Sequence, residues 1–222
     1  QRVGIADLNG DGRYDFVIKQ PNKNVDPGEG YWQRSEDTYK VEAYLSDGTF
    51  LWRRDLGWSI EQGIWYSPMI VYDLDGDGRA EVCLKTGPEE DLRDAEGKVQ
   101  TGPEWLSIWD GMTGEEITRT DWPSRQGFES YNLASRNQMC VAYLDGKTPC
   151  LIVERGTYRT IKEVAYQYRD RQLQELWRWN DREEPGGLYR GQGAHSMHAV
   201  DVDGDGRDEV FLGSAVLDDN GV

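Results

Sequence analysis

Three short acidic loops share one spacing and are the part of this sequence best suited to metal chemistry. They span residues 7–15, 73–81 and 201–209, and each has acids or an asparagine at positions one, three, five and nine. Side-chain oxygens at these positions, with a backbone carbonyl at position seven, offer a hard cation an all-oxygen shell. Glycines at positions four and six permit the sharp turn that such a shell needs. The spacing therefore predicts three Ca²⁺ sites.

The predicted ligands are side-chain oxygens and, from each arginine, the backbone carbonyl. They are Asp7, Asn9, Asp11, Arg13 and Asp15 in the first loop, Asp73, Asp75, Asp77, Arg79 and Glu81 in the second, and Asp201, Asp203, Asp205, Arg207 and Glu209 in the third. Position twelve, which carries a bidentate glutamate in EF-hand loops, is apolar here, so these are not EF-hands. Solvated acidic turns are the alternative interpretation, but such clusters of carboxylates repel one another unless a counter-charge is present. We expect the ions to be structural, because all the ligands serve to fix a turn.

Each acidic loop lies between two runs rich in β-forming residues, as at residues 3–6 and 16–18. The loop is therefore expected to join two antiparallel strands. A fourth copy, at residues 139–153, keeps both apolar runs but has lost the acids, so it is expected to keep the hairpin without the metal. Cys83 and Cys140 fall at apolar positions of these hairpins and are predicted to be core residues.

A second kind of hairpin alternates with the first, at residues 41–52, 105–117 and 164–177. Two hairpins give four strands per repeat, at intervals of about 60–70 residues, which is typical of propeller blades with long loops. We therefore predict an all-β fold, a β-propeller of four-stranded blades, with about three and a half blades in residues 1–222. Because roughly four to eight blades close a propeller, we expect a fragment of a longer chain, with the other blades supplied by the rest of the polypeptide or by another chain.

The composition narrows the classes of partner. Of 222 residues, 25 are Lys or Arg and 41 are Asp or Glu, a formal net charge of −16 that argues against nucleic acid or anionic membranes as partners. No apolar run is long enough to span a bilayer, and the first residues lack the features of a signal peptide, so the protein is expected to be cytosolic or to have lost a leader. The three cysteines include no CxxC pair, which supports neither a disulfide framework nor a zinc site.

Few residues outside the loops are suited to catalysis. The motifs GxSxG, HExxH, GxxxxGK[ST] and GxGxxG are absent, which removes several classes of hydrolase and nucleotide-binding enzyme. The two histidines both fall within residues 189–198, just before the third acidic loop. Strand alternation places His195 and His198 on opposite sides, so the two imidazoles are not expected to share a site.

Other candidates lie at equivalent ends of predicted strands. Lys85 and Arg155 each end an apolar run, and Tyr158 follows shortly after Arg155. Cations and a phenol gathered at the propeller axis would suit an anionic ligand, although solvent-facing strand ends are the alternative. Some of the nine tryptophans could stack on sugars, but Trp52 and Trp177 occupy repeat positions and are expected in the core between blades.

These motifs, taken in order along the chain, carry a resemblance to a known family. The segments are residues 7–15 with their strands, 55–57 with 67–69 and the loop at Asp73, 142–146, the GQGAH segment at 191–195 with its acidic loop, and the tail 213–221. Together they resemble the rhamnogalacturonan lyases of polysaccharide lyase family eleven. One departure is Ala194, where members of this family usually carry asparagine.

The resemblance implies a Ca²⁺-rich, eight-bladed propeller that is secreted, periplasmic or on the cell surface. It also implies a substrate, the acidic plant polysaccharide rhamnogalacturonan I of pectin, whose rhamnosyl–galacturonate backbone the family cleaves by β-elimination. Two alternatives remain open at this point. One is a related lyase acting on rhamnose–glucuronate linkages of arabinogalactan, and the other is a non-catalytic, calcium-stabilised propeller that binds glycans or a protein.

β-Elimination sets requirements that some of these residues could meet. Removing H5 of a uronate requires its carboxylate to be neutralised by Ca²⁺ or a cationic side chain, and a base must take the proton. His195 could be that base or a ligand of a catalytic Ca²⁺, and Arg155 or Lys85 could hold the carboxylate. Tyr158 or Tyr189 could protonate the leaving oxygen. These roles are hypotheses.

Overall fold

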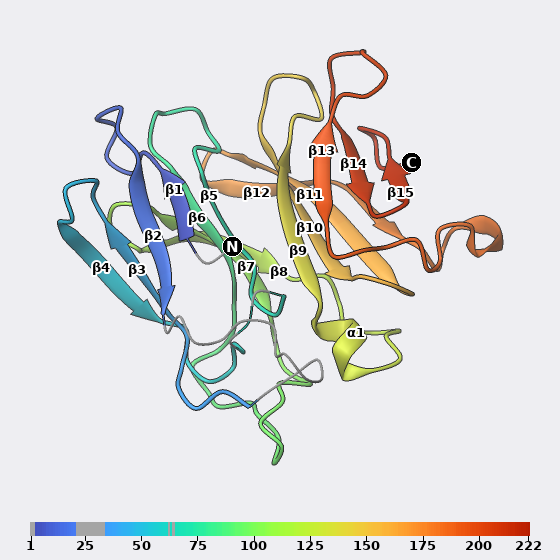
Figure 1. The fold of residues 1–222 in the computed structure, drawn as a ribbon, viewed down its shortest axis with the longest axis horizontal. Helices are drawn as coiled ribbons and strands as arrows, with labels where there is room; N and C mark the ends of the chain where they lie inside the picture. Colours follow the sequence, from blue (N-terminus) through green and yellow to red (C-terminus); the bar gives the residue numbers. More distant parts are fainter. Residues whose placement is uncertain (1–2, 21–33, 62, 64) are drawn as a thin grey trace. The chain divides into compact units, whose positions relative to one another are not determined.

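The structure is a computed structural model that describes residues 3–20, 34–61, 63 and 65–222. The described residues form an all-β fold of four antiparallel sheets with three or four strands each (Figure 1). The chain divides into two compact units, residues 1–122 and 123–222. The predicted all-β class is confirmed.

The first unit contains two four-stranded sheets, each a simple meander. Strands β1 (Val3–Ala6), β2 (Asp15–Gln20), β3 (Lys40–Tyr44) and β4 (Phe50–Asp55) form one, and β5 (Met69–Tyr72), β6 (Glu81–Thr86), β7 (Trp105–Asp110) and β8 (Glu116–Asp121) form the other. Residues 7–14 join β1 to β2, and residues 73–80 join β5 to β6. Two predicted acidic hairpins and two hairpins of the second kind are therefore confirmed.

The second unit repeats this arrangement after a short helix. Its elements are α1 (Tyr131–Ser135), a sheet of β9 (Asn137–Ala142), β10 (Cys150–Gly156), β11 (Ile161–Arg169) and β12 (Gln172–Asn180), the 3₁₀ turn η1 (Pro185–Gly187), and a sheet of β13 (Met197–Val200), β14 (Glu209–Leu212) and β15 (Ala215–Leu217). The hairpin that lost its acids is present as β9 and β10. The last sheet has three strands rather than the predicted opening hairpin alone, because residues 215–217 pair with β14.

Within each unit the two sheets share an apolar core. In the first, Val17 and Val41 of one sheet belong to the same buried cluster as Val82 and Trp109 of the other. In the second, Ile152 clusters with residues of β14 and β15. Cys83 and Cys150 are buried, Cys140 is half-buried and packs against this second cluster, and all three thiols are free. Their prediction as core residues is confirmed for Cys83 and supported for Cys140.

A tryptophan at the same repeat position ties the sheets together in both units. Trp52 of β4 donates its indole N–H to the carbonyl of Gly111 (2.8 Å), and Trp177 of β12 donates to the carbonyl of Asp219 (2.9 Å). A Cβ added at Gly114 or Gly221 would lie within 3 Å of the corresponding indole, so glycine is needed at both turns. Both tryptophans therefore join neighbouring sheets, as predicted from their repeat positions.

Among the described residues no helix is long and apolar enough to cross a membrane.

Candidate metal loops and a tyrosine–histidine pair

The glycines of the acidic loops adopt the backbone conformation that the sequence predicts. In the second loop φ is +77° at Gly76 and +89° at Gly78, and in the third it is +81° at Gly204 and +92° at Gly206. A Cβ at any of these four positions would meet nothing within 4 Å. Glycine is therefore required by the positive φ, which other residues adopt only with strain, and not by lack of space.

The first carboxylate of each loop shapes the turn. Asp73 accepts the N–H of Gly76 on Oδ1 (2.7 Å) and that of Gly78 on Oδ2 (2.9 Å), and Asp201 makes the same two bonds in its own loop. Asp7 does likewise in the first loop. Burial would raise the pKa of Asp7, but backbone N–H groups, Gly12 first, hold that pKa below its usual value. The loops thus share one hydrogen-bonded frame.

The acid at position nine reaches back to the second residue of its loop. Glu81 Oε2 accepts the N–H of Leu74 (2.9 Å), and Glu209 Oε2 accepts that of Val202 (2.8 Å). In the first loop Asp15 is fully buried and uses both oxygens, accepting from Leu8 (3.0 Å) and from Ser46 (2.7 Å). The position-nine acid therefore anchors the loop to the strands in all three copies.

Two of the loops bring their acids together closely enough for a cation. One oxygen each from Asp73, Asp75 and Glu81 lies within 4.8 Å of the others, and Asp201, Asp203 and Glu209 form the matching cluster. In the first loop Asn9 replaces the acid at position three and donates from Nδ2 to Asp11 Oδ2 (3.2 Å). The donor set of each cluster is oxygen only, which suits a hard cation such as Ca²⁺. The carbonyl roles of Arg13, Arg79 and Arg207, and the site at the first loop, stay predictions.

The charge of the second loop predicts a pH dependence of the metal-free protein. Burial raises the pKa of Glu81 to about 7, with repulsion from Asp75 and Asp73 adding to it and the Leu74 N–H opposing. Because this folded-state pKa lies above the usual value, the metal-free protein is expected to lose stability as pH rises through about 7. Ca²⁺ must displace the same proton, so apparent Ca²⁺ affinity is expected to rise over that range.

Thermal unfolding in a chelator between pH 6 and pH 8 measures this effect. The Glu81→Gln variant, which cannot ionise, should have a flatter profile of Tm against pH. An identical profile for the variant and the parent protein would contradict the assignment to Glu81.

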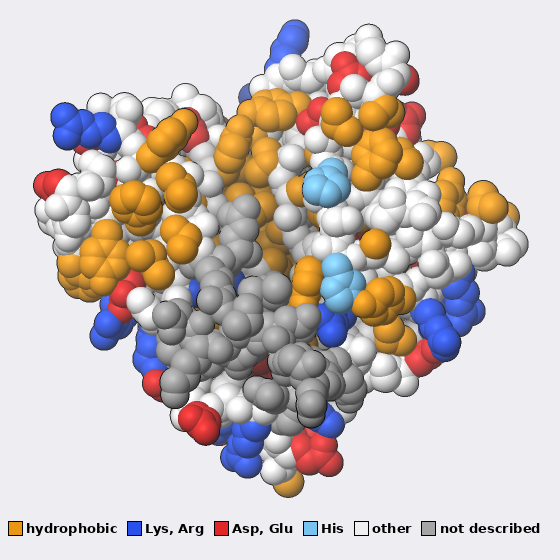
Figure 2. Space-filling model, viewed as in Figure 1, with side chains coloured by type: hydrophobic (Ala, Val, Ile, Leu, Met, Phe, Trp, Pro, Cys, Tyr) orange, Lys and Arg blue, Asp and Glu red, His pale blue; other side chains and the backbone are white. Residues whose placement is uncertain are grey.

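The structure brings two of the predicted catalytic residues together. Tyr158, which follows β10, and His195, which precedes β13, are hydrogen-bonded between the phenol oxygen and Nε2. Their ring centroids are 5.1 Å apart. Tyr158 is 39% exposed and His195 is half-buried, so the pair is open to solvent. Figure 2 shows the two histidines as separate pale blue patches, in agreement with the prediction that they do not share a site.

Two glycines allow the segment that carries His195 to pack closely against neighbouring backbone. A Cβ on Gly193 would lie 1.6 Å from the carbonyl oxygen of Thr157, and one on Gly213 would lie 2.5 Å from that of Gln192. The Ser214 N–H also donates to the Gln192 carbonyl (2.8 Å). The GQG run therefore allows its backbone to lie directly against the segment beside Tyr158.

Sequence reasoning missed Gln138, which fixes the residue next to His195. Its amide nitrogen donates to Glu154 Oε2 (3.0 Å) and to the carbonyl of Ala194 (2.9 Å). Glu154 is fully buried opposite Glu163 of β11, and burial raises the pKa of both carboxyls well above the usual value. The signal that could have pointed to Gln138 is the presence of two acids, Glu154 and Glu163, within runs of apolar residues that predict buried strands. Gln138 is a positioning residue for the His195 segment.

Arg155 and Lys85, predicted to lie at ligand-facing strand ends, are both enclosed in the structure. Arg155 is fully buried, with Nε donating to the Pro123 carbonyl and Nη1 to that of Ala134 in α1. Lys85 is 5% exposed and ion-paired with the half-buried Glu104 (2.5 Å). Both cations bind partners within their own unit, and this geometry fits a structural role.

The ring contact of Tyr189 is with Trp179 and not with Tyr158 or His195. Its ring packs edge to face against Trp179, with centroids 5.5 Å apart. It is half-buried at the margin of the apolar core of the second unit. A role for Tyr189 in protonating a leaving group stays a prediction.

Three exposed arginines surround one acid in the second unit. Glu129 lies 2.8 Å from Arg190, 3.4 Å from Arg182 and 3.6 Å from Arg159, each distance measured from a guanidinium nitrogen to a carboxylate oxygen. Arg159 directly follows Tyr158 in the sequence. The carboxyl of Asp181 also interacts electrostatically with Arg182 and Arg190, so this cluster gathers three guanidinium groups around two carboxylates.

Meandering sheets, three of which carry an oxygen-rich acidic loop between their first two strands, define an all-β fold with candidate sites for hard cations. The family model for the C-terminal domain of rhamnogalacturonan lyase family 11 matches residues 1–222. The chain therefore belongs to rhamnogalacturonan lyase family 11, and it corresponds to the C-terminal domain of that family. The resemblance noted from the sequence motifs is confirmed.

Two curated proteins of Bacillus subtilis (strain 168) are similar to this chain. The rhamnogalacturonan exolyase YesX is 37% identical over 240 residues, covering 99% of this chain and 39% of that protein. The rhamnogalacturonan endolyase YesW is 37% identical over 243 residues, covering 99% of this chain and 38% of that protein. The chain thus spans about two fifths of the length of these relatives.

Solved structures agree with this relationship. The exotype rhamnogalacturonan lyase YesX matches with a TM-score of 0.92 and 35% identity, over 100% of this chain and 40% of that one. A rhamnogalacturonan lyase from Bacillus licheniformis matches with a TM-score of 0.90 and 36% identity, over 100% of this chain and 41% of that one. The fold of this chain is therefore that of part of these lyases.

Proposed function

We propose that this chain is part of a calcium-dependent lyase that cleaves the rhamnosyl–galacturonate backbone of rhamnogalacturonan I by β-elimination. The observation that carries the proposal is the Tyr158–His195 pair, in a chain that matches the family along its whole length. The two curated relatives, an exolyase and an endolyase of rhamnogalacturonan, support the substrate class.

The pair can move a proton at the reacting sugar. β-Elimination takes H5 from the uronate, forms the C4–C5 double bond and releases the glycosidic oxygen at C4, which needs a proton. A neutral imidazole with its proton on Nδ1 accepts the phenol proton at Nε2, so proton gain and loss at the Tyr158 oxygen are coupled to His195. Gln138 holds the adjacent Ala194 carbonyl and so limits movement of His195.

Ca²⁺ is the group that this family relationship and the loop chemistry imply. The residues that would hold it are the carboxylates of the loops at 73–81 and 201–209, whose all-oxygen clusters fit a hard cation. A bound Ca²⁺ supplies counter-charge and crosslinks the turn between two strands. The third loop directly follows β13, so fixing it also fixes the strand that begins two residues after His195.

The arginines around Glu129 support recognition of an acidic polysaccharide. Guanidinium groups bind carboxylates in a planar, bidentate manner, and these three are exposed or nearly so. We assign them to the carboxylates of galacturonate residues next to the cleaved one. Arg155 and Lys85, which the sequence offered for this role, are both buried.

This assignment predicts that Arg159→Ala raises KM for the polymer with little change in kcat. Removing one exposed charge pair weakens binding by up to about 1 kcal/mol, which corresponds to roughly fivefold in KM. Steady-state kinetics at low and high salt measure it, and the effect should shrink as salt rises. Arg169→Ala, at the exposed end of β11, is the matched control. Equal effects of the two variants would contradict the assignment.

We further propose that the four sheets are consecutive blades of a propeller, completed to eight blades by the rest of the polypeptide. The repeated tryptophan–turn contact at Trp52 and Trp177 supports it, because the same interface joins neighbouring sheets twice. A secreted, periplasmic or cell-surface location would give the protein access to a plant polysaccharide and to extracellular Ca²⁺.

An absorbance assay tests the proposal against its two rivals. The full-length protein is mixed with rhamnogalacturonan I and, separately, with an arabinogalactan capped by rhamnose–glucuronate, with and without a chelator. We expect ultraviolet absorbance from an unsaturated uronate with rhamnogalacturonan I only, and its loss on chelation. Signal with the arabinogalactan alone would point to the related lyase. Binding without any signal, by folded and Ca²⁺-loaded protein, would indicate the non-catalytic binding propeller.

A further inference from the structure

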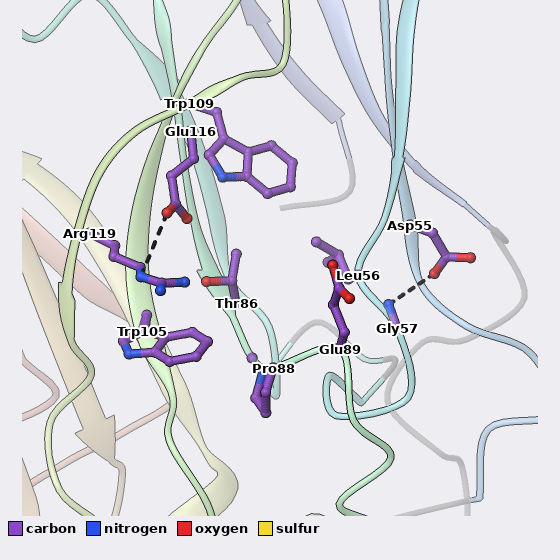
Figure 3. A pocket seen from close by; sticks show the side chains of 11 residues that line it. Asp55, Leu56, Gly57, Thr86, Pro88, Glu89, Trp105, Trp109, Glu116 and Arg119 are labelled. Carbon is purple, nitrogen blue, oxygen red and sulfur yellow. Dashed lines mark hydrogen bonds and ion pairs between the residues drawn. The ribbon is translucent and has the colours of Figure 1, made fainter.

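The first unit contains an open pocket that the lyase proposal does not use. It is lined by residues of strands β4, β6, β7 and β8 and of the loops that follow β4 and β6, and it has a volume of about 560 Å³ (Figure 3). Small-molecule sites in proteins have volumes of about 300–1,000 Å³, so the pocket is large enough for a sugar residue.

Part of the pocket lining is apolar. Trp105, Trp109, Pro88 and Leu56 line it. Trp105 is half-buried, and the guanidinium of Arg119 lies 4.0 Å from the centre of its ring, which fixes both side chains. Indole and proline surfaces of this kind pack well against the C–H faces of sugar rings.

The lining also presents hydrogen-bonding groups that are already held in position. Glu116 accepts from Ser107 Oγ at Oε2 (2.7 Å), and its Oε1 lies 3.6 Å from Arg119 Nε. Thr86 and Ser107 share a hydrogen bond (2.6 Å), and because Ser107 donates to Glu116, Thr86 must donate to Ser107. Glu116 is therefore oriented before any ligand enters, which lowers the entropy lost on binding.

Asp55 is fixed in the same way on the opposite wall. Its Oδ1 accepts the N–H of Gly57 (2.9 Å), and its Oδ2 accepts the hydroxyl of Thr38 (2.8 Å). In Figure 3 Asp55 and Glu116 come from opposite sides of the pocket. Each carboxylate retains lone pairs that can accept from sugar hydroxyls.

A buried donor without a partner lies in the wall as well. The Nε1 of Trp109 is buried and has no hydrogen-bond partner among the described residues. In Figure 3 this nitrogen is on the edge of the ring that faces Glu116. Because this nitrogen is inaccessible to solvent, it shapes the wall of the pocket and does not itself offer a contact to a ligand.

The charge of the lining selects the class of ligand. Asp55, Glu89 and Glu116 outnumber the one cation, Arg119, so the pocket is net negative and repels an anionic uronate. A bound metal is not favoured either, because among the described residues the acids converge closely enough for a cation only in the second and third acidic loops. A neutral sugar has hydroxyls for the carboxylates and apolar faces for the tryptophans.

We propose that this pocket binds a neutral hexose or 6-deoxyhexose residue of a glycan. The pocket would act as a holding site that keeps a polysaccharide on the protein. The inference stands on the pocket alone and does not require the lyase activity, although an alternating rhamnose and galacturonate backbone would supply a suitable residue.

Titrations of the full-length protein with three methyl glycosides test the inference. The probes are methyl α-rhamnoside, methyl β-galactoside and methyl α-galacturonoside, and saturation-transfer NMR reports binding without any turnover. We expect a neutral glycoside to bind and the galacturonoside to bind at least tenfold more weakly. Trp105→Ala and Glu116→Gln should each weaken binding of the neutral glycoside at least fivefold.

Trp58→Ala is the matched control, because Trp58 also stacks with an arginine, Arg93 (3.8 Å), but does not line the pocket. The control should leave binding unchanged. The inference is wrong if no neutral glycoside binds, if the galacturonoside binds as well as the neutral ones, or if Trp58→Ala weakens binding as much as Trp105→Ala. Because none of these readouts depends on cleavage, a failure here is distinguishable from a failure of the lyase proposal.

Discussion

Removing Ca²⁺ is expected to lower the Tm of this protein by roughly 10–30 °C. At free Ca²⁺ about 100-fold above Kd, one bound ion stabilises the folded state by about 2.7 kcal/mol, so two or three ions contribute about 5–8 kcal/mol. For a chain of 222 residues each kcal/mol corresponds to a change of about 2–4 °C in Tm. The physical reason is that the second and third loops each gather carboxylates that repel one another until a cation is present.

Calorimetry in Ca²⁺ and in a chelator measures this difference, and loop variants locate it. Asp75→Ala and Asp203→Ala each remove one member of an acidic cluster and should shrink the difference in Tm between the two conditions. Asp145→Ala is the control, because Asp145 caps the turn of the hairpin without acids by accepting from Lys147 (2.9 Å) and Thr148 (2.6 Å). It should lower Tm equally in both conditions. A Tm that does not respond to Ca²⁺ would contradict the metal assignment.

The second large effect is a loss of turnover of at least 100-fold in His195→Ala. A positioned acid or base contributes about 10²–10⁴-fold to a proton-transfer step, and His195 contacts the phenol that shares the proton. Tyr158→Phe should lose turnover as well, because it keeps the ring but removes the hydroxyl. The two losses should not multiply in the double variant, since the residues act as a unit.

Kinetics of the full-length protein on rhamnogalacturonan I check these losses. His198→Ala is the control for histidine, since His198 is exposed on β13. Tyr44→Phe is the control for loss of a tyrosine hydroxyl, because Tyr44 lies in β3 of the first unit, where its hydroxyl donates to Glu42 (2.8 Å). Both controls should retain kcat within a few-fold. Full turnover in His195→Ala, or an equal loss in His198→Ala, would show that the pair does not carry the chemistry.

The hairpins and loop turns could be predicted from the sequence because their causes are local. Positive φ at Gly76 and Gly78, for example, follows from a spacing of a few residues and needs no tertiary contact. Strand β15 could not be predicted, since three residues in a polar tail become a strand only by pairing with β14. The short helix α1 is likewise held by a long-range contact, from the buried guanidinium of Arg155.

The candidate site was predictable only in part, for the same reason. Tyr158 and His195 are 37 residues apart, and their contact depends on glycines that let two backbone segments touch. Arg155 and Lys85 lie at strand ends for which the sequence pattern predicts exposure, but neighbouring segments cover them. Glu154 and Glu163 are both buried as cross-strand partners, a placement that composition alone argues against.

The chemistry of bond cleavage is the most direct test of the central claim. Rhamnogalacturonan I is digested by the full-length protein in ¹⁸O-labelled water, with and without a chelator, and the products are analysed by mass spectrometry. The account predicts products that carry an unsaturated uronate at the new non-reducing end, take up ¹⁸O no faster than a reducing sugar exchanges it with water, and disappear on chelation until Ca²⁺ is restored. Saturated products that gain one ¹⁸O atom for each bond cleaved would show hydrolysis instead of elimination, and an intact polymer in the presence of folded, Ca²⁺-loaded protein would contradict the account altogether.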